Sequence, residues 1–320
     1  MNSATQQSRE RSLESLSFNL GADLIDALNN PNVVEVLVNP DKTVWVERLG
    51  QGMKCIGTME SSRSRMIITL VAASLETNAS VESPIIEGEL PLDGSRFEGL
   101  LPPVVSNPSF TIRKKASQVF TLEQYVEQGI MPPLVRDLIS QAVQNHKNIL
   151  VVGGTGSGKT TLVNGIIDAI ALLCPHDRAV IIEDTAELQS TSENTVFLRT
   201  SDFVDMNRLL RATMRLRPDR ILVGEVRGGE ALTLLKSWNT GHPGGVATVH
   251  ANSAYGGLTR LEQLISEATI APMQQLIAEA VHIVLVITRT PQGRTIREVI
   301  EVTGYDPVVQ KYTYEVIYEN

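Results

Sequence analysis

The chain has 320 residues, of which 42% are hydrophobic, 20% charged and 4% aromatic, and its formal net charge is −8. This composition is typical of a folded globular protein with room for two domains. It does not fit a protein that coats nucleic acid, because phosphate binding requires a basic surface and single strands stack on aromatic rings.

The N-terminal part of the sequence mixes helical and strand patterns. Its first 17 residues are polar, and we expect them to be flexible. An amphipathic helix is predicted over residues 21–29, where an Asn-Pro pair ends it, and another over residues 62–76. Between them, the alternating runs VVEVLV and TVWVER predict a hairpin. Because Pro-rich and Gly-rich sequence follows, including LPLDGSRFEGLLPP, residues 18–113 are expected to form a small α+β domain closing on a loop.

A second domain is predicted after a polar linker over residues 114–132. Residues 133–320 contain continuous apolar, β-branched runs separated by helical patterns. Such runs are typical of strands buried on both faces of a mostly parallel sheet, so this domain is predicted to be α/β. The runs are NILVVG, AVIIED, TVFLRT, RILVGE, GVATVH and HIVLVIT.

The segment NILVVGGTGSGKTTLVNGII places a complete GxxxxGK[ST] motif directly after a predicted strand and before a predicted helix. Glycines let the backbone curl so that its amide groups point at phosphates, and the helix N-terminus adds the positive end of its dipole. Lys159 is expected to contact the β- and γ-phosphates, and the Thr160 hydroxyl to bind Mg²⁺. The predicted nucleotide-binding residues are Gly153, Gly154, Thr155, Gly156, Ser157, Gly158, Lys159, Thr160 and Thr161.

Two later strands deliver carboxylates to the carboxyl end of the predicted sheet, where α/β folds bind ligands. AVIIEDTAE supplies Glu183, Asp184 and Glu187, and RILVGE supplies Glu225 after a glycine. A carboxylate there can order the Mg²⁺ shell or polarise the attacking water, or it can be a solvated acid at a strand end. We expect the functional role for Glu225 and Glu183, and both interpretations stay open for Asp184 and Glu187.

Four stretches follow one another along the chain: GGTGSGKTT, IIEDTAE, RILVGEVRGGE and TGHPGGVATVHANS. They resemble the Walker A motif, Asp box, atypical Walker B motif and His box of the secretion ATPases that power type II and type IV secretion, type IV pili and conjugation. The earlier SRFEGLLPPV and FTIRKKA resemble the arginine segments of that family's N-terminal domain. The short chain, the HANSAYGGLTRLEQL stretch and the lack of a four-cysteine zinc module resemble the conjugal-transfer branch of type IV secretion, of the TrbB type. The two cysteines present are Cys55 and Cys174.

The resemblance implies a RecA-like P-loop NTPase domain, an N-terminal domain folded over the nucleotide, and a homo-hexameric ring that hydrolyses ATP with Mg²⁺. It implies that Lys159 and Thr160 bind phosphate and Mg²⁺, that Glu225 is the Walker B acid at the Mg²⁺, and that Glu183 is the Asp-box acid. One departure, Gly153-Gly154 where Gly-Pro or Gly-Ala is common in the family, leaves the requirements of the phosphate loop intact.

The resemblance also implies a role for arginines of the N-terminal domain. It makes Arg96 and Arg113 candidates for reaching the γ-phosphate, a role that suits the always-charged guanidinium. The alternative is that both are exposed arginines in a loop and a linker. Arg208, Arg211 and Arg215 fall at helical spacing, where they form either a solvated basic face or part of a subunit boundary.

The glycine-rich stretch TGHPGGVATVHANS carries His242 and His250. Two imidazoles without a third ligand argue against a metal site. GVATVH is a predicted strand ending beside the γ-phosphate, so His250 is expected to bond differently to the ATP and ADP states. Gly241, Gly244 and Gly245 are expected to let the loop that precedes this strand shift. Core packing stays open as the alternative for both histidines.

Localisation and partners follow from the sequence and the resemblance together. We expect a cytoplasmic protein, because residues 1–18 lack a signal-peptide core and no later segment approaches the ~20 apolar residues that span a bilayer. The resemblance implies peripheral association with the inner membrane through components of a type IV secretion channel, in DNA transfer, pilus assembly or both.

Two other functions share the nucleotide-binding core. A RecA-like nucleic-acid translocase would require a basic groove with aromatic side chains, which this composition supplies poorly, so direct nucleic-acid binding is not expected. A nucleotide-switched GTPase would require the guanine-reading NKxD pattern, which the chain lacks.

Overall fold

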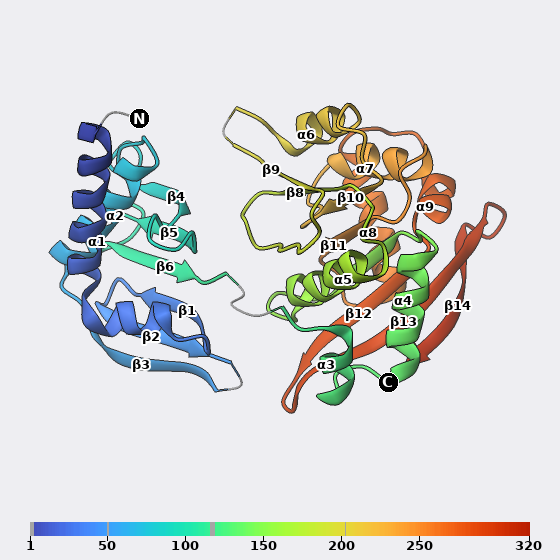
Figure 1. The fold of residues 1–320 in the computed structure, drawn as a ribbon, viewed down its shortest axis with the longest axis horizontal. Coiled ribbons are helices and arrows are strands. Elements are labelled where there is room, and N and C mark those ends of the chain that lie inside the picture. The colour runs from blue at the N-terminus through green and yellow to red at the C-terminus, as the bar shows by residue number, and fades with distance from the viewer. Residues whose placement is uncertain (1–2, 50, 116–118, 202) are drawn as a thin grey trace. The chain divides into compact units, whose positions relative to one another are not determined.

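The chain divides into two compact units in a computed structural model that describes residues 3–49, 51–115, 119–201 and 203–320 (Figure 1). The units are Met1–Gln118 and Val119–Asn320, so the division falls inside the stretch predicted to be a linker. In the described part of the chain, no helix has both the length and the apolar character needed to cross a bilayer.

The first unit is an antiparallel sheet with two helices. Its strands follow the order β3-β2-β1-β6-β5-β4, and each neighbouring pair is antiparallel. Apolar side chains of both helices and of the sheet share one buried cluster. The elements are α1 (Ser3–Asn29), β1 (Val33–Val38), β2 (Thr43–Arg48), β3 (Gly52–Thr58), α2 (Ser61–Ser74), β4 (Ile85–Glu89), β5 (Arg96–Leu100) and β6 (Ser109–Arg113).

The prediction of a flexible N-terminus differs from the structure, in which α1 begins at Ser3. Leu16 and Leu20 lie one helical turn apart and are buried in the core of the first unit, which explains why the helix starts before residue 18. The only non-helical backbone inside α1 is at Gly21, whose φ is 77°. The Arg63 side chain of α2 donates to the two backbone carbonyls just before this break.

The Pro-rich and Gly-rich segment is also more regular than predicted. Instead of a loop, it forms the antiparallel pair β4 and β5. Phe97 is fully buried, and Gly99 lies where a side chain would collide with Phe97 and Ile68. A glycine therefore marks a strand here, because the sheet packs too closely against α2 for a larger residue.

The second unit is built on one eight-stranded sheet in the order β14-β13-β12-β7-β11-β10-β8-β9. Strands β12 to β9 in that order pair in parallel, and β12, β13 and β14 pair antiparallel. Alternate residues of β7 enter two different apolar clusters, so the strand is buried on both faces as predicted. The elements are α3 (Leu122–Glu127), α4 (Pro133–Gln144), β7 (Ile149–Val152), α5 (Lys159–Leu173), β8 (Ala179–Glu183), β9 (Thr195–Arg199), α6 (Met206–Thr213), β10 (Arg220–Val223), α7 (Glu230–Asn239), β11 (Val246–Val249), α8 (Ala254–Ser266), α9 (Gln274–Ala280), β12 (Ile283–Thr290), β13 (Gly293–Asp306) and β14 (Lys311–Glu319).

All six predicted strand runs are strands of this sheet, and the mostly parallel α/β domain is confirmed. Two further features were not predicted. The C-terminal hairpin of β13 and β14 extends the sheet antiparallel beyond β12. The stretch predicted as a linker to residue 132 contains α3, whose Leu122 and Tyr125 are buried in the core of the second unit.

Candidate nucleotide-binding site

The glycine-rich motif forms the connection between β7 and α5. Gly156 and Gly158 have φ angles of 69° and 101°, in the left-handed region that favours glycine. A side chain at Gly153 would collide with the Ile287 carbonyl and with Ser157. The loop therefore wraps closely at the N-terminus of α5, where backbone amides and the helix dipole favour an anion. Thr160 and Thr161 lie half-buried in the first turn of α5, and Thr155 is exposed.

Lys159 lies buried at the centre of the site. Its Nζ donates to the carbonyls of Gly153 and Gly154 at 2.9 and 3.0 Å, and it lies 3.2 Å from Nδ1 of His250. An ammonium has no lone pair to accept with, so Nδ1 of His250 is the acceptor and the ring proton sits on Nε2. Burial, and then the Lys159 charge, lowers the pKa of His250 below its usual value, which keeps the ring neutral at physiological pH.

Glu225 connects this histidine to an arginine. Its Oε1 lies 2.6 Å from Nε2 of His250. Its Oε2 accepts from Nε and Nη2 of Arg227 at 2.8 and 2.5 Å, and Nη1 of Arg227 lies 3.3 Å from Oδ2 of Asp184. The contacts thus run in one line from Lys159 through His250, Glu225 and Arg227 to Asp184. Arg227 is not among the residues predicted from the sequence, although it lies only two residues after Glu225.

The turn that carries Glu225 is fixed from the neighbouring strand. Thr248 of β11 donates from its hydroxyl to the Gly224 carbonyl at 2.7 Å, and its own carbonyl accepts from the Val226 amide at 2.9 Å. Because His250 follows Thr248 by two residues, one strand end holds both the acid and its histidine partner.

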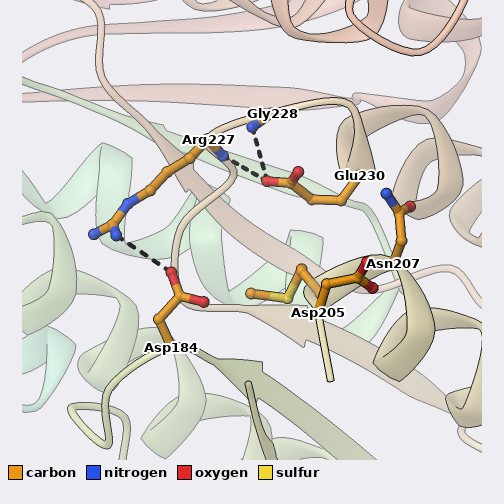
Figure 2. A pocket seen from close by; sticks show the side chains of 7 residues that line it. Asp184, Asp205, Asn207, Arg227, Gly228 and Glu230 are labelled. Carbon is orange, nitrogen blue, oxygen red and sulfur yellow. Dashed lines mark hydrogen bonds and ion pairs between the residues drawn. The ribbon is translucent and has the colours of Figure 1, made fainter. Parts of the chain in front are cut away.

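Beyond Arg227 the surface is hollowed by a pocket of about 340 Å³ (Figure 2). Glu230, at the start of α7, points one carboxylate oxygen at the amides of Arg227 and Gly228, at 2.7 and 2.9 Å. Those bonds fix the backbone that presents the Arg227 side chain. The pocket is lined by Asp184, Asp205, Met206, Asn207, Arg227, Gly228 and Glu230.

Glu183 is buried at the end of β8 and faces its own loop. Its carboxylate accepts from the backbone amides of Glu187 and Leu188 at 2.5 and 3.1 Å. Burial raises its pKa to about 7. Asn164 of α5, which the sequence analysis missed, holds the same loop by donating to the Glu187 carbonyl and accepting from the Gln189 amide, at 3.1 and 2.9 Å. The loop after β8 is therefore held by two side chains, the carboxylate of Glu183 and the amide of Asn164.

His242 lies away from this line of contacts. Its Nδ1 lies 2.8 Å from the Pro218 carbonyl, just before β10, and β10, β11 and β7 are parallel. The loop before β11 therefore lies at the opposite edge of the sheet from the phosphate loop. Its glycines therefore lie away from the phosphate loop, and a Cβ on Gly245 would collide with Trp238 and the Ile221 carbonyl.

The predicted arginines fall into two groups. In the first unit, Arg96 and Arg113 are direct cross-strand partners on β5 and β6. In the second unit, Arg208 and Arg211 lie exposed on α6, and Arg215 is exposed just past its end.

Sequence comparisons identify relatives along most of the chain. A family model described as "Type II/IV secretion system protein" matches residues 20–311. The chain is 53% identical to the "Probable conjugal transfer protein TrbB" of Sinorhizobium fredii, over 93% of this chain and 92% of that protein. It is 52% identical to the "Conjugal transfer protein TrbB" of Rhizobium radiobacter, over 93% of each chain.

The fold agrees with these relatives. The X-ray structure of the Legionella pneumophila ATPase DotB matches with a TM-score of 0.61 over 92% of this chain and 80% of that chain, at 17% identity. This likeness shows a shared fold and confirms the predicted two-domain architecture with a RecA-like C-terminal domain. The chain therefore belongs to the family of type II/IV secretion system proteins, in the conjugal-transfer branch that its sequence motifs indicated.

Proposed function

We propose that this chain hydrolyses ATP with Mg²⁺ as a homo-hexamer and thereby drives a type IV secretion or conjugation apparatus. The observation that carries the proposal is the line of contacts from Lys159 of the phosphate loop through His250 to Glu225. The relatives named for conjugal transfer support the kind of apparatus. Its place would be the cytoplasmic face of the inner membrane, in contact with membrane components of the channel.

The phosphate loop would bind the triphosphate. A Cβ on Gly153 would fill the loop, and the buried Ser157 hydroxyl lacks a hydrogen-bond partner among the described residues, so the donor set fits a bound anion. Lys159 would supply the cation that neutralises the phosphates. Mg²⁺, when bound with the nucleotide, would be held by Thr160 and Glu225 and would withdraw charge from the phosphate oxygens.

Glu225 would be the acid that orients the attacking water. Its Oε2 accepts from the guanidinium of Arg227, and its Oε1 lies close to Nε2 of His250 without a hydrogen bond among the described residues. These contacts fix the side chain before substrate arrives, which is the preorganisation that lowers a barrier. Asp184, at the far end of Arg227, couples the loop after β8 to this orientation.

His250 would report the state of the nucleotide. Nδ1 of His250 contacts Lys159, and Nε2 contacts Glu225. If Lys159 moved toward a γ-phosphate, Nδ1 would lose its donor, and the contact of the ring with Glu225 would change. Glu183 would act as a positioning residue through the loop that it caps, rather than by touching the phosphates. Arg96 and Arg113 would approach the γ-phosphate from the N-terminal domain.

A transfer assay in a strain that lacks this protein tests the function. Complementation with Lys159→Ala should abolish transfer, because the phosphates lose their main cation. Lys236→Ala, which removes an exposed lysine from α7, is the matched control and should restore transfer. Normal transfer by cells carrying only Lys159→Ala would refute the motor function.

A further inference from the structure

Arg294 lies against the phosphate loop from the hairpin of β12 and β13. Strand β12 runs parallel to β7, and β13 returns antiparallel with Arg294 opposite Arg289. This pairing brings the start of β13 to the carboxyl edge of the sheet, where the phosphate loop lies. The Arg294 side chain covers the last glycine of that loop: a Cβ on Gly158 would lie 2.8 Å from its Cδ and 3.0 Å from its Nε.

The guanidinium of Arg294 has a buried donor without a partner among the described residues. Its Nε is buried and has no hydrogen-bond partner in the part of the chain that the structure describes. Its electrostatic neighbour is the hydroxyl of Tyr125, and burial raises the pKa of that tyrosine, so the neighbour carries no charge. The buried hydroxyl of Ser157, beside Gly158 in sequence, is likewise unpaired among the described residues.

Arg220 shows how this chain treats an arginine that serves structure alone. It is fully buried, and every nitrogen has a partner: Nε donates to Asp177 at 2.6 Å, Nη1 to the Gly244 carbonyl at 3.1 Å and Nη2 to the Val143 carbonyl at 2.8 Å. A buried donor without a partner costs about 1–3 kcal/mol, so the unsatisfied Nε of Arg294 beside the phosphate loop indicates a partner that arrives with the ligand.

We propose that Arg294 binds the phosphates of the nucleotide, in the diphosphate as well as the triphosphate. This inference rests on the proposed function. In the sheet order, β12 lies on one side of β7 and β11 on the other. Arg294 therefore contacts the phosphate loop from the flank opposite to His250 and Glu225. A guanidinium suits this place because it stays charged and offers a planar set of donors to phosphate oxygens.

The position of Arg294 separates its role from that of the hydrolytic residues. Its side chain packs against Gly158, just before α5, and takes no part in the contacts that join Lys159, His250 and Glu225. Its loss should therefore weaken the binding of ADP and ATP alike.

Equilibrium titration of the purified full chain with ADP tests the inference. Arg294→Met keeps the aliphatic packing over Gly158 and removes the charge, and it should raise the Kd for ADP by about tenfold or more. Arg294→Lys should recover part of the affinity. Arg289→Met removes the exposed cross-strand partner on the same hairpin and should bind ADP like the wild type.

The outcomes separate the two proposals. If the wild-type chain does not bind ADP, the proposed function fails. If it binds and Arg294→Met binds equally well, Arg294 only packs over the loop and this inference is overturned. Thermal unfolding without nucleotide checks that the variants fold, and Arg294→Gln is judged by the same criterion should the methionine variant not fold.

Discussion

At the residue scale, His250 is the group that contacts both Lys159 of the phosphate loop and Glu225. Its ring accepts from Lys159 on one nitrogen and faces Glu225 with the other. This arrangement requires the neutral form, which the lowered pKa provides. Protonation would place a second positive charge beside Lys159 and remove the acceptor. The same ring is half-exposed, so a bound nucleotide can reach it.

Substitution of His250 tests this link. His250→Ala should lower the turnover number by about tenfold or more, equivalent to ~1.4 kcal/mol of transition-state stabilisation, with little change in ADP affinity. His250→Asn, which can keep an acceptor near Nδ1, should retain more activity. His242→Ala, whose ring contacts the Pro218 carbonyl at the other edge of the sheet, is the control. Equal turnover in His250→Ala and wild type would remove the histidine from the mechanism.

Glu183 should make stability depend on pH. Its folded pKa of about 7 lies above the usual value of 4.5, so the unfolded chain releases this proton first as the pH rises. The wild type therefore loses stability from pH 4.5 up through 7, whereas Glu183→Gln lacks this loss. The difference in unfolding free energy between variant and wild type should shift in the variant's favour by up to about 3 kcal/mol between pH 5 and 8. Urea denaturation at several pH values measures it, and a pH-independent difference would contradict it.

At the element scale, the sequence allows the parallel strands to be predicted better than their neighbours. Runs such as AVIIED are apolar throughout because both faces of the sheet are covered, and this pattern is visible without a structure. The strand β13 was not predicted because Ile296, Val299 and Ile300 do not alternate with polar residues, and only the irregular register of its pairing with β12 explains that spacing.

Some residues of the candidate site are likewise predictable from the sequence, and others are not. Lys159 and Glu225 are predictable because each lies in a motif at a strand end. Asn164, Arg227 and Arg294 are not, since their roles depend on contacts between distant segments: α5 with the loop after β8, β10 with β8, and β13 with β7. A buried asparagine on an apolar helix was the one local signal available for Asn164.

The clamp between α5 and the loop after β8 can be measured directly. Asn164→Leu leaves the Glu187 carbonyl and the Gln189 amide without their partner, and it should lower the unfolding free energy by about 1–3 kcal/mol. Asn164→Asp keeps the acceptor for Gln189 but places a buried carboxylate against the Glu187 carbonyl, so at neutral pH it should cost at least as much. Urea unfolding measures the unfolding free energy of both variants. An Asn164→Leu variant as stable as the wild type would show that the bonds from Asn164 do not contribute to stability.

At the scale of the whole molecule, the proposed function draws on residues of both units. Arg96 and Arg113 lie directly opposite each other on β5 and β6, and like charges in such pairs are destabilising. Glu35 of β1 stands opposite Arg113 on its other side and offsets part of this cost. The register thus makes Arg96 and Arg113 direct neighbours in the first unit and joint candidates for contacting an anion. Their approach to the γ-phosphate, and the hexamer that would organise it, stay proposals.

In the proposed function, Glu225 completes an ATP-hydrolysing site on the phosphate loop, and phosphate release by the purified full chain tests this role most directly. The wild type should release phosphate from ATP with Mg²⁺. Glu225→Gln should bind ADP with wild-type affinity yet lose at least about a hundredfold in turnover, because the shape remains and the carboxylate is gone. Wild-type turnover by Glu225→Gln would contradict the account.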